Sequence, residues 1–214
     1  MADKAVFVDR DGTIVGLVYD KETGYVDSIT RPEQVKLLPG ASEALKRLKD
    51  SGYKLILVSN KPEIAKGRVD EETFWETQRV IEDRLRNSSG VEFDGIYFCL
   101  HHPQAIVEKY RADCECRKPK PGLILKAAKE HDLDIKNSYL VGDDILDIKA
   151  GRAAGCKAIM LGHANSTILQ ILDDEGLKVE GIVGSLNDAL RIILSDSHGS
   201  EERYKRKGLS NGTK

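Results

Sequence analysis

Two short apolar segments of this sequence end in aspartates. Residues 5–8 are followed by Asp9 and Asp11, and residues 139–141 lead through a glycine to Asp143. Short apolar runs of this kind are typical of buried parallel strands, and ligands of open α/β sheets bind beyond the carboxyl ends of such strands. Three carboxylates that meet there repel one another unless a divalent cation neutralises them. Oxygen ligands suit Mg²⁺, so the pattern predicts metal-assisted phosphoryl transfer.

The rest of the sequence alternates between strand and helix patterns. Predicted strands lie at 5–8, 54–58, 95–98, 138–141, 157–161 and 181–183. Predicted helices lie at 41–50, 121–130, 147–154 and 186–194, and one more runs from a cap at Asp70 to about Leu85. A long loop is predicted at 14–31. This alternation predicts an α/β fold with three Rossmann-like layers, in which helices cover both faces of a mostly parallel sheet.

Composition and charge narrow the possible partners. The 214 residues are 40% hydrophobic and 32% charged, and the formal net charge is −2. This balance gives no reason to expect nucleic acid as a partner, and no apolar run is long enough for a membrane span or resembles a signal peptide. We expect a single domain at 1–195 and a disordered polar tail at 196–214. The expected protein is a cytoplasmic monomer that acts on a small molecule.

A second group of residues has the types and spacing of a zinc site. Cys99 and His101 form a C-x-H pair, and Cys114 and Cys116 form a C-x-C pair. Zinc prefers these ligand types in closed tetrahedral sites, so the pattern predicts a structural zinc that pins the intervening loop. The C-x-H spacing favours His101 over His102 as the ligand. The alternative is a set of reduced thiols with a surface histidine.

The aspartate segments belong to a longer series of motifs. DRDGT at residues 9–13 resembles the D-x-D-G-T motif of the haloacid dehalogenase superfamily of phosphatases. A strand ending at Ser59, a lysine at Lys118 just before a helix, and Asp143 complete the superfamily's signature in the same order. Four motifs in the right order are far more specific than the first motif alone.

This resemblance implies a role for each motif residue. Asp9 is the expected nucleophile and forms an aspartyl-phosphate. Asp11 is the expected general acid and base, and its backbone carbonyl joins the carboxylates of Asp9 and Asp143 around Mg²⁺. Ser59 and Lys118 are expected to stabilise the phosphoryl oxygens.

Two further aspartates follow the fourth motif, and their roles stay open. Either Asp144 or Asp147 could orient Lys118 or a metal-bound water, and either could cap the helix that starts there.

Motif spacing also bears on substrate access. About 50 residues separate Asp9 from Ser59, and about 57 lie between Asn60 and Lys118. The predicted core elements use up both intervals. We therefore expect no separate cap domain and an open active site.

The cysteine pattern narrows the resemblance. C-x-H-H-P followed by C-x-C-R-K-P-x-P-G is similar to the D-glycero-D-manno-heptose 1,7-bisphosphate 7-phosphatases, and the related histidinol-phosphate phosphatases have a shorter metal loop. The resemblance implies removal of the 7-phosphate from a heptose bisphosphate. The residues expected to contact the substrate are Gly24, Tyr25, Asn60, Lys61 and Arg117. Lys61, Pro62 and Glu63 replace the usual Gln-Ser-Gly, and Asp144 stands where many relatives have lysine.

Three other functions remain as alternatives. Histidinol-phosphate hydrolysis is disfavoured by the long cysteine loop, and polynucleotide 3′-phosphatase activity by the net charge. A carbohydrate-binding protein without activity would normally have lost Asp9 or Asp11.

Overall fold

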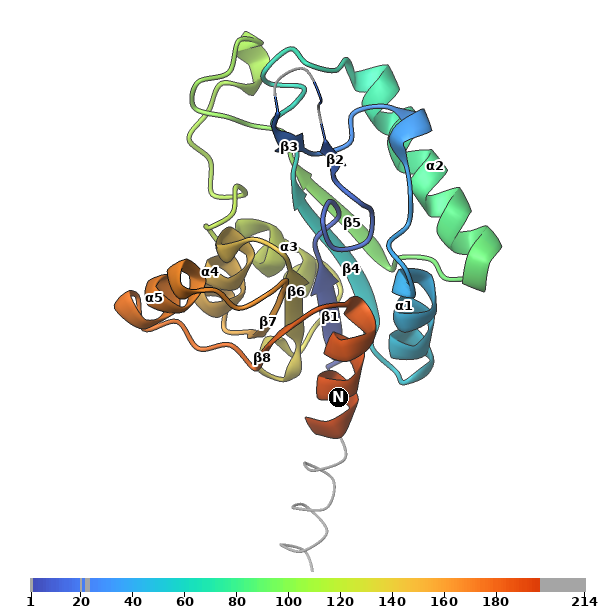
Figure 1. The fold of residues 1–214 in the computed structure, drawn as a ribbon, viewed down its shortest axis with the longest axis vertical. Coiled ribbons are helices and arrows are strands. Elements are labelled where there is room, and N and C mark those ends of the chain that lie inside the picture. The colour runs from blue at the N-terminus through green and yellow to red at the C-terminus, as the bar shows by residue number, and fades with distance from the viewer. Residues whose placement is uncertain (1, 20, 22–23, 197–214) are drawn as a thin grey trace, which may run out of the picture.

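The computed structural model describes residues 2–19, 21 and 24–196, and Figure 1 shows their arrangement. Beyond Asp196, the predicted tail lies outside the described residues. The main sheet contains β1 (Ala5–Val8), β4 (Lys54–Asn60), β5 (Gly95–Cys99), β6 (Tyr139–Gly142), β7 (Lys157–Leu161) and β8 (Gly181–Val183). Its order is β5-β4-β1-β6-β7-β8, and every neighbouring pair is parallel.

Helices cover both faces of this sheet, which confirms the predicted three-layer fold. They are α1 (Ala41–Asp50), α2 (Glu71–Ser89), α3 (Gly122–Glu130), α4 (Ile145–Ala154), α5 (Ser166–Asp174) and a helix at 186–196. Short 3₁₀ turns occur at η1 (Pro32–Gln34), η2 (Glu108–Tyr110) and η3 (Ile135–Asn137). The core clusters place α1, α2 and the helix at 186–196 on one face, and α3, α4 and α5 on the other.

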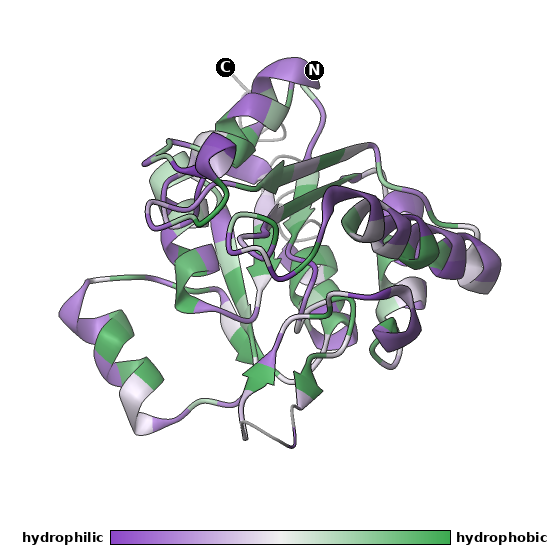
Figure 2. Ribbon diagram, turned by 90° about the horizontal axis from the view of Figure 1, so that it is seen from above, coloured by the Kyte–Doolittle hydropathy of each residue, from purple (hydrophilic) through white to green (hydrophobic). Residues whose placement is uncertain are grey.

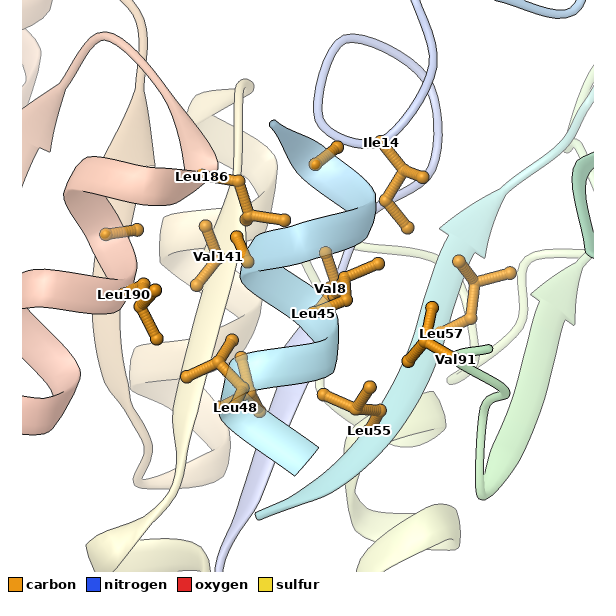
Figure 3. Packing of buried hydrophobic residues seen from close by; sticks show 14 of the residues in the cluster. Val8, Ile14, Leu45, Leu48, Leu55, Leu57, Val91, Val141, Leu186 and Leu190 are labelled. Atoms are coloured by element: carbon orange, nitrogen blue, oxygen red, sulfur yellow. The ribbon is translucent and has the colours of Figure 1, made fainter. Parts of the chain in front are cut away.

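Strand β1 lies in the middle of the sheet and is buried on both faces. Val6 and Val8 pack in the core below α1, whereas Ala5 and Phe7 pack toward α3. Figure 3 shows Val8 of the first cluster together with Leu45 of α1. Because both faces are covered, the strand is a continuous apolar run rather than an alternating one.

The strand order reverses at β1, and this reversal creates the place for a site. From β1 the chain extends the sheet through β4 and β5 on one side, and then through β6, β7 and β8 on the other. The carboxyl ends of the strands on either side of such a switch point form a crevice between diverging loops.

Most predicted elements appear with small shifts at their ends. The Asp70 side chain accepts a hydrogen bond from the Thr73 amide at 2.7 Å, as expected for a helix cap, but α2 continues to Ser89. Gly90 ends it with a left-handed φ of 71°. Helix α4 begins at Ile145, two residues before the predicted start.

The prediction for one loop was wrong, and one helix was missed. Within the predicted loop 14–31, β2 (Val18–Tyr19) and β3 (Val26–Asp27) pair in an antiparallel two-stranded sheet. Two-residue strands carry too little alternation to be detected in a sequence. Helix α5 was not predicted at all, although the parallel step from β7 to β8 requires a crossover segment.

Across the described part of the chain, core elements occupy the two intervals between the motifs, as the spacing predicts. Between Asp9 and Ser59 lie β2, β3, η1, α1 and most of β4, and between Asn60 and Lys118 lie α2, β5 and η2. Figure 2 shows hydrophilic residues on the outer sides of the helices and hydrophobic residues on the sheet.

No helix among the described residues combines the length and hydropathy that crossing a membrane would require.

The first prediction tests the core below α1. Leu45 is 0% exposed, whereas Leu125 on α3 is 44% exposed. Leu45→Ala is expected to lower the free energy of unfolding by about 2–5 kcal/mol, because it leaves a cavity that the sheet cannot fill. Leu125→Ala, the matched control, is expected to change it by at most about 0.5 kcal/mol. Urea unfolding measures both values, and equal losses would contradict this description of the core.

Candidate active site

Side chains from neighbouring strands meet at the carboxyl edge of the sheet. Asp9 follows β1, Ser59 lies near the end of β4, and Asp143 follows β6. Lys118 reaches the same place from the loop before α3. Together with Asp11, these residues line one pocket of about 300 Å³. The structure therefore brings together all of the residues that the sequence predicts to be catalytic.

Lys118 makes the central polar contacts of this pocket. Its Nζ donates hydrogen bonds to Asp9 Oδ1 at 2.7 Å and to the Val58 carbonyl at 3.1 Å, and it also contacts the Asp147 carboxylate. Burial alone would lower the pKa of Lys118, but the charges of Asp147 and Asp9 raise it above its ordinary value. The ammonium therefore stays protonated beside Asp9.

A cluster of carboxylates surrounds this ammonium. One carboxylate oxygen from each of Asp9, Asp143 and Asp147 lies within 4.8 Å of the others. Burial, followed by the charge of Asp9, raises the pKa of Asp143 to about 7. A divalent cation would offset the repulsion that opposes ionisation here. Because oxygen donors of this kind suit Mg²⁺, the residues present fit a magnesium ion.

The two aspartates at the start of α4 take different roles. The Asp144 carboxylate accepts a hydrogen bond from the Leu146 amide at 2.9 Å and so caps α4. Asp147 accepts from the Asp144 amide at 3.2 Å and also contacts Lys118. Of the alternatives left open by the sequence, Asp144 caps the helix, whereas Asp147 both caps it and orients Lys118.

Glycines in two of the motifs make room for these carboxylates. Gly12 has a φ of +75°, and a Cβ there would lie 2.0 Å from Asp143 Oδ2. A Cβ on Gly142 would lie 2.4 Å from Asp147 Cγ. Both positions therefore exclude any side chain, because the space it would occupy is filled by a site carboxylate.

Asp11 lies in a separate set of contacts. Its Oδ2 accepts hydrogen bonds from Arg10 Nε and Lys61 Nζ, both at 2.9 Å, and its Oδ1 accepts from the Ile29 amide at 3.2 Å. Burial alone would raise the pKa of Asp11, but the charges of Arg10 and Lys61 hold it below its ordinary value. The Asp11 carboxylate is not part of the cluster around Asp9, so its predicted metal contact rests on its backbone carbonyl and stays a prediction.

The side chain of Asn60 is paired with the backbone of Lys118. Asn60 Nδ2 donates to the Lys118 carbonyl, and the Lys118 amide donates to Asn60 Oδ1, both at 3.0 Å. Asn60 lines the pocket, but this pairing engages both ends of its amide. Asn60 was predicted to contact the substrate, but in this structure its side chain holds the backbone of Lys118 in place.

The other predicted substrate residues are placed differently from one another. Lys61 is 1% exposed and is directed at Asp11 rather than into the pocket. Tyr25 is 74% exposed beside β3, next to Gly24, and neither residue is part of the pocket wall. The neighbouring residues 26–28 do line it.

Arg117 is the predicted substrate residue that lies in the pocket wall with its charge available. Its Nη1 donates to the His101 carbonyl at 3.4 Å. Burial, together with the charges of Arg117 and Lys66, lowers the pKa of the neighbouring His102. Arg117 and Lys118 are thus the two cations among the described residues that line the pocket, which otherwise contains several carboxylates.

The four predicted zinc ligands come together beside Arg117. Cys116 Sγ lies 3.1 Å from the sulfurs of Cys99 and Cys114 and 3.4 Å from His101 Nδ1. Their ligand atoms all lie within 4.8 Å of one another. Sulfurs bound to one tetrahedral zinc at about 2.3 Å would be about 3.8 Å apart, so a small outward shift would admit the ion. The donor set fits zinc.

Two buried charged residues of the site were not predicted from the sequence. Arg10 is 0% exposed, lies over the rings of Phe74 and Phe98, and contacts Asp11. Glu63 is 5% exposed and lines the pocket. The sequence gives no sign that Arg10 is buried. Glu63, however, stands in the segment 61–63, which replaces the Gln-Ser-Gly that is usual in the heptose bisphosphate phosphatases.

Comparison with known proteins identifies the family. A family model described as haloacid dehalogenase-like hydrolase matches residues 18–155. D-glycero-beta-D-manno-heptose-1,7-bisphosphate 7-phosphatase of Pasteurella multocida (strain Pm70) is 42% identical over 190 residues, covering 89% of this chain and 96% of that enzyme. The enzyme of the same name from Vibrio cholerae serotype O1 is 40% identical over 170 residues, covering 79% and 87%.

A solved structure agrees with the sequence relatives. The crystal structure of D,D-heptose 1.7-bisphosphate phosphatase from B. bronchiseptica, complexed with magnesium and phosphate, superposes with a TM-score of 0.72 at 26% identity. The match covers 90% of this chain and 99% of that chain. On the match to the family model and the extent of these similarities, this chain belongs to the haloacid dehalogenase-like hydrolases.

Proposed function

We propose that this protein removes the 7-phosphate from D-glycero-D-manno-heptose 1,7-bisphosphate through an aspartyl-phosphate on Asp9. The observation that carries the proposal is the pocket in which Asp9 lies between the Lys118 ammonium and the partly buried Asp143 carboxylate. The substrate is supported by the names of relatives about 40% identical to this chain, such as those of Pasteurella multocida and Vibrio cholerae.

In the first half of the reaction, a carboxylate oxygen of Asp9 attacks phosphorus while Asp11 gives a proton to the departing sugar oxygen. In the second half, Asp11 takes a proton from the water that hydrolyses the aspartyl-phosphate. Lys118 and Ser59 would stabilise charge on the phosphoryl oxygens. Asp9, Asp143 and the Asp11 carbonyl would hold Mg²⁺, which supplies charge neutralisation at the phosphoryl group when bound.

The cysteine cluster would stabilise the neighbouring segment that carries Arg117 and Lys118. We infer that Cys99, His101, Cys114 and Cys116 bind one structural zinc, with protein ligands at all four positions. Cys116 directly precedes Arg117 and Lys118 in the chain. The ion would therefore fix the start of the segment that carries both cations. The cytoplasmic compartment and the monomeric state stay predictions from the sequence.

The second prediction tests the roles of the two motif aspartates. Asp9→Asn is expected to abolish turnover because an amide is a poor nucleophile, and Asp11→Asn is expected to lower kcat for the sugar ester by about 10²–10⁴. Phosphate release with magnesium measures both effects. Asp50→Asn, a change on the exposed end of α1, is the control. Turnover by Asp9→Asn at the rate of the unaltered protein would refute the mechanism.

The third prediction concerns zinc. Elemental analysis of the purified protein is expected to find about one zinc per chain, and Cys114→Ser/Cys116→Ser is expected to lose it because two of four ligands are gone. Cys156→Ser is the control, since Cys156 lies outside the cluster and should leave the zinc content unchanged. Stoichiometric zinc in the double variant would show that the ligands are assigned wrongly.

The fourth prediction concerns the second phosphate of the substrate. Arg117 is expected to bind this second phosphate. The value of kcat/KM should therefore be higher for the heptose 1,7-bisphosphate than for the heptose 7-monophosphate, which lacks it. Arg117→Ala is expected to remove ~1.5–3 kcal/mol of this preference, as for a lost charged hydrogen bond. Lys120→Ala is the matched control, because its ammonium is engaged by Asp113 and Glu115. Equal kcat/KM for both compounds in the unaltered protein would refute the assignment of the heptose bisphosphate as the substrate.

A further inference from the structure

Four charged side chains are buried together in and behind the pocket wall. Arg10 is 0% exposed, Lys61 1%, Glu63 5% and Asp11 6%. They comprise two cations and two anions, so the group is neutral as a whole. Two of its members, Lys61 and Glu63, belong to the segment that replaces the Gln-Ser-Gly usual in the heptose bisphosphate phosphatases.

Lys61 joins the two carboxylates of this group. Its Nζ lies 2.9 Å from Asp11 Oδ2 and 3.5 Å from Glu63 Oε2. Within the described chain, Glu63 Oε2 is buried and makes no hydrogen bond, so the Lys61 ammonium is the cation that faces it. Glu63 therefore balances the charge of Lys61 while the hydrogen bond of Lys61 goes to Asp11.

The backbone around Lys61 is fixed by the sheet. Lys61 follows the last residue of β4, and its amide donates to the carbonyl of Cys99, the last residue of β5, at 2.8 Å. The second cation that contacts Asp11, the Arg10 guanidinium, lies over the rings of Phe74 and Phe98, 5.7 and 5.9 Å from their centroids. The Asp11 carboxylate is thus held between two cations whose own positions are set by packed elements.

We propose that Lys61 is a positioning residue for Asp11 and that Glu63 is its counter-charge. The proposal rests on the phosphatase mechanism above, in which Asp11 exchanges protons with the leaving oxygen and with water. General acid and base catalysis needs the carboxyl group within hydrogen-bond reach of the reacting oxygen. A buried ion pair often adds no stability over apolar residues of similar size, so stability alone is a weak reason for this group beside the pocket.

The dependence of rate on the leaving group separates positioning from a purely structural role. The constant kcat/KM covers the steps up to departure of the alcohol. A sugar alkoxide needs a proton from Asp11 in that step, whereas the leaving group of 4-nitrophenyl phosphate departs without one. The ratio of kcat/KM for the heptose bisphosphate to that for 4-nitrophenyl phosphate therefore reports on proton donation. Because both values come from one preparation, the folded fraction cancels.

The main variant is Lys61→Gln/Glu63→Gln, which leaves Arg10 opposite Asp11 and keeps the buried group neutral. Lys61→Gln alone is the second variant, and Lys46→Gln on the exposed face of α1 is the matched control. Loss of the Lys61 charge raises the pKa of Asp11 and so favours its proton-donating form, whereas loss of its position slows proton transfer. Because we propose that position decides, the ratio is expected to fall by at least about tenfold in both Lys61 variants. It is expected to stay within about twofold in the control.

Two results would overturn the proposal. If kcat/KM falls by the same factor for both substrates, Lys61 has only a structural role, and if neither value changes, it has no role in the reaction. Asp9→Asn is assayed in parallel, because an active Asp9→Asn protein defeats the phosphatase mechanism itself. An unchanged ratio together with an inactive Asp9→Asn protein defeats only the role of Lys61.

Discussion

The buried ammonium of Lys118 is the contact on which the rest of the site depends. It bridges Asp9 at the end of β1 and Asp147 in the first turn of α4, and it also donates to the Val58 carbonyl in β4. Without a cation at this point, several buried carboxylates would face one another across the pocket. The loop before α3 that delivers Lys118 is held by Asn60, and the proposed zinc at the cysteine cluster would hold it as well.

The two motif aspartates are two residues apart in sequence but lie in different electrostatic surroundings. Asp9 faces Lys118 and the other site carboxylates, where a magnesium ion and a phosphoryl group can be accommodated. Asp11 is turned toward Arg10 and Lys61. This separation suits a reaction in which one carboxylate bonds to phosphorus and the other only moves protons. Asp9 therefore faces one buried cation, Lys118, whereas Asp11 faces two.

The catalytic constellation could be predicted from the sequence because strand ends are visible there. Apolar runs that stop at Asp9, Ser59 and Asp143 indicate buried parallel strands, and parallel strands bring their carboxyl ends to one edge. The direction of individual side chains could not be predicted. Asn60 and Lys61 follow one another in the chain, yet one pairs with the Lys118 backbone and the other with Asp11, because long-range contacts decide where each side chain points.

The proposed mechanism requires a phosphorylated Asp9, and this intermediate can be trapped. The protein is mixed with the heptose bisphosphate and magnesium, quenched in acid within a turnover, digested and analysed by mass spectrometry. We expect one added phosphoryl group on the peptide that contains Asp9, and none when Asp9→Asn is treated in the same way. Turnover of the substrate with no phosphorylated peptide at any quench time, or with the phosphoryl group on another residue, would contradict it.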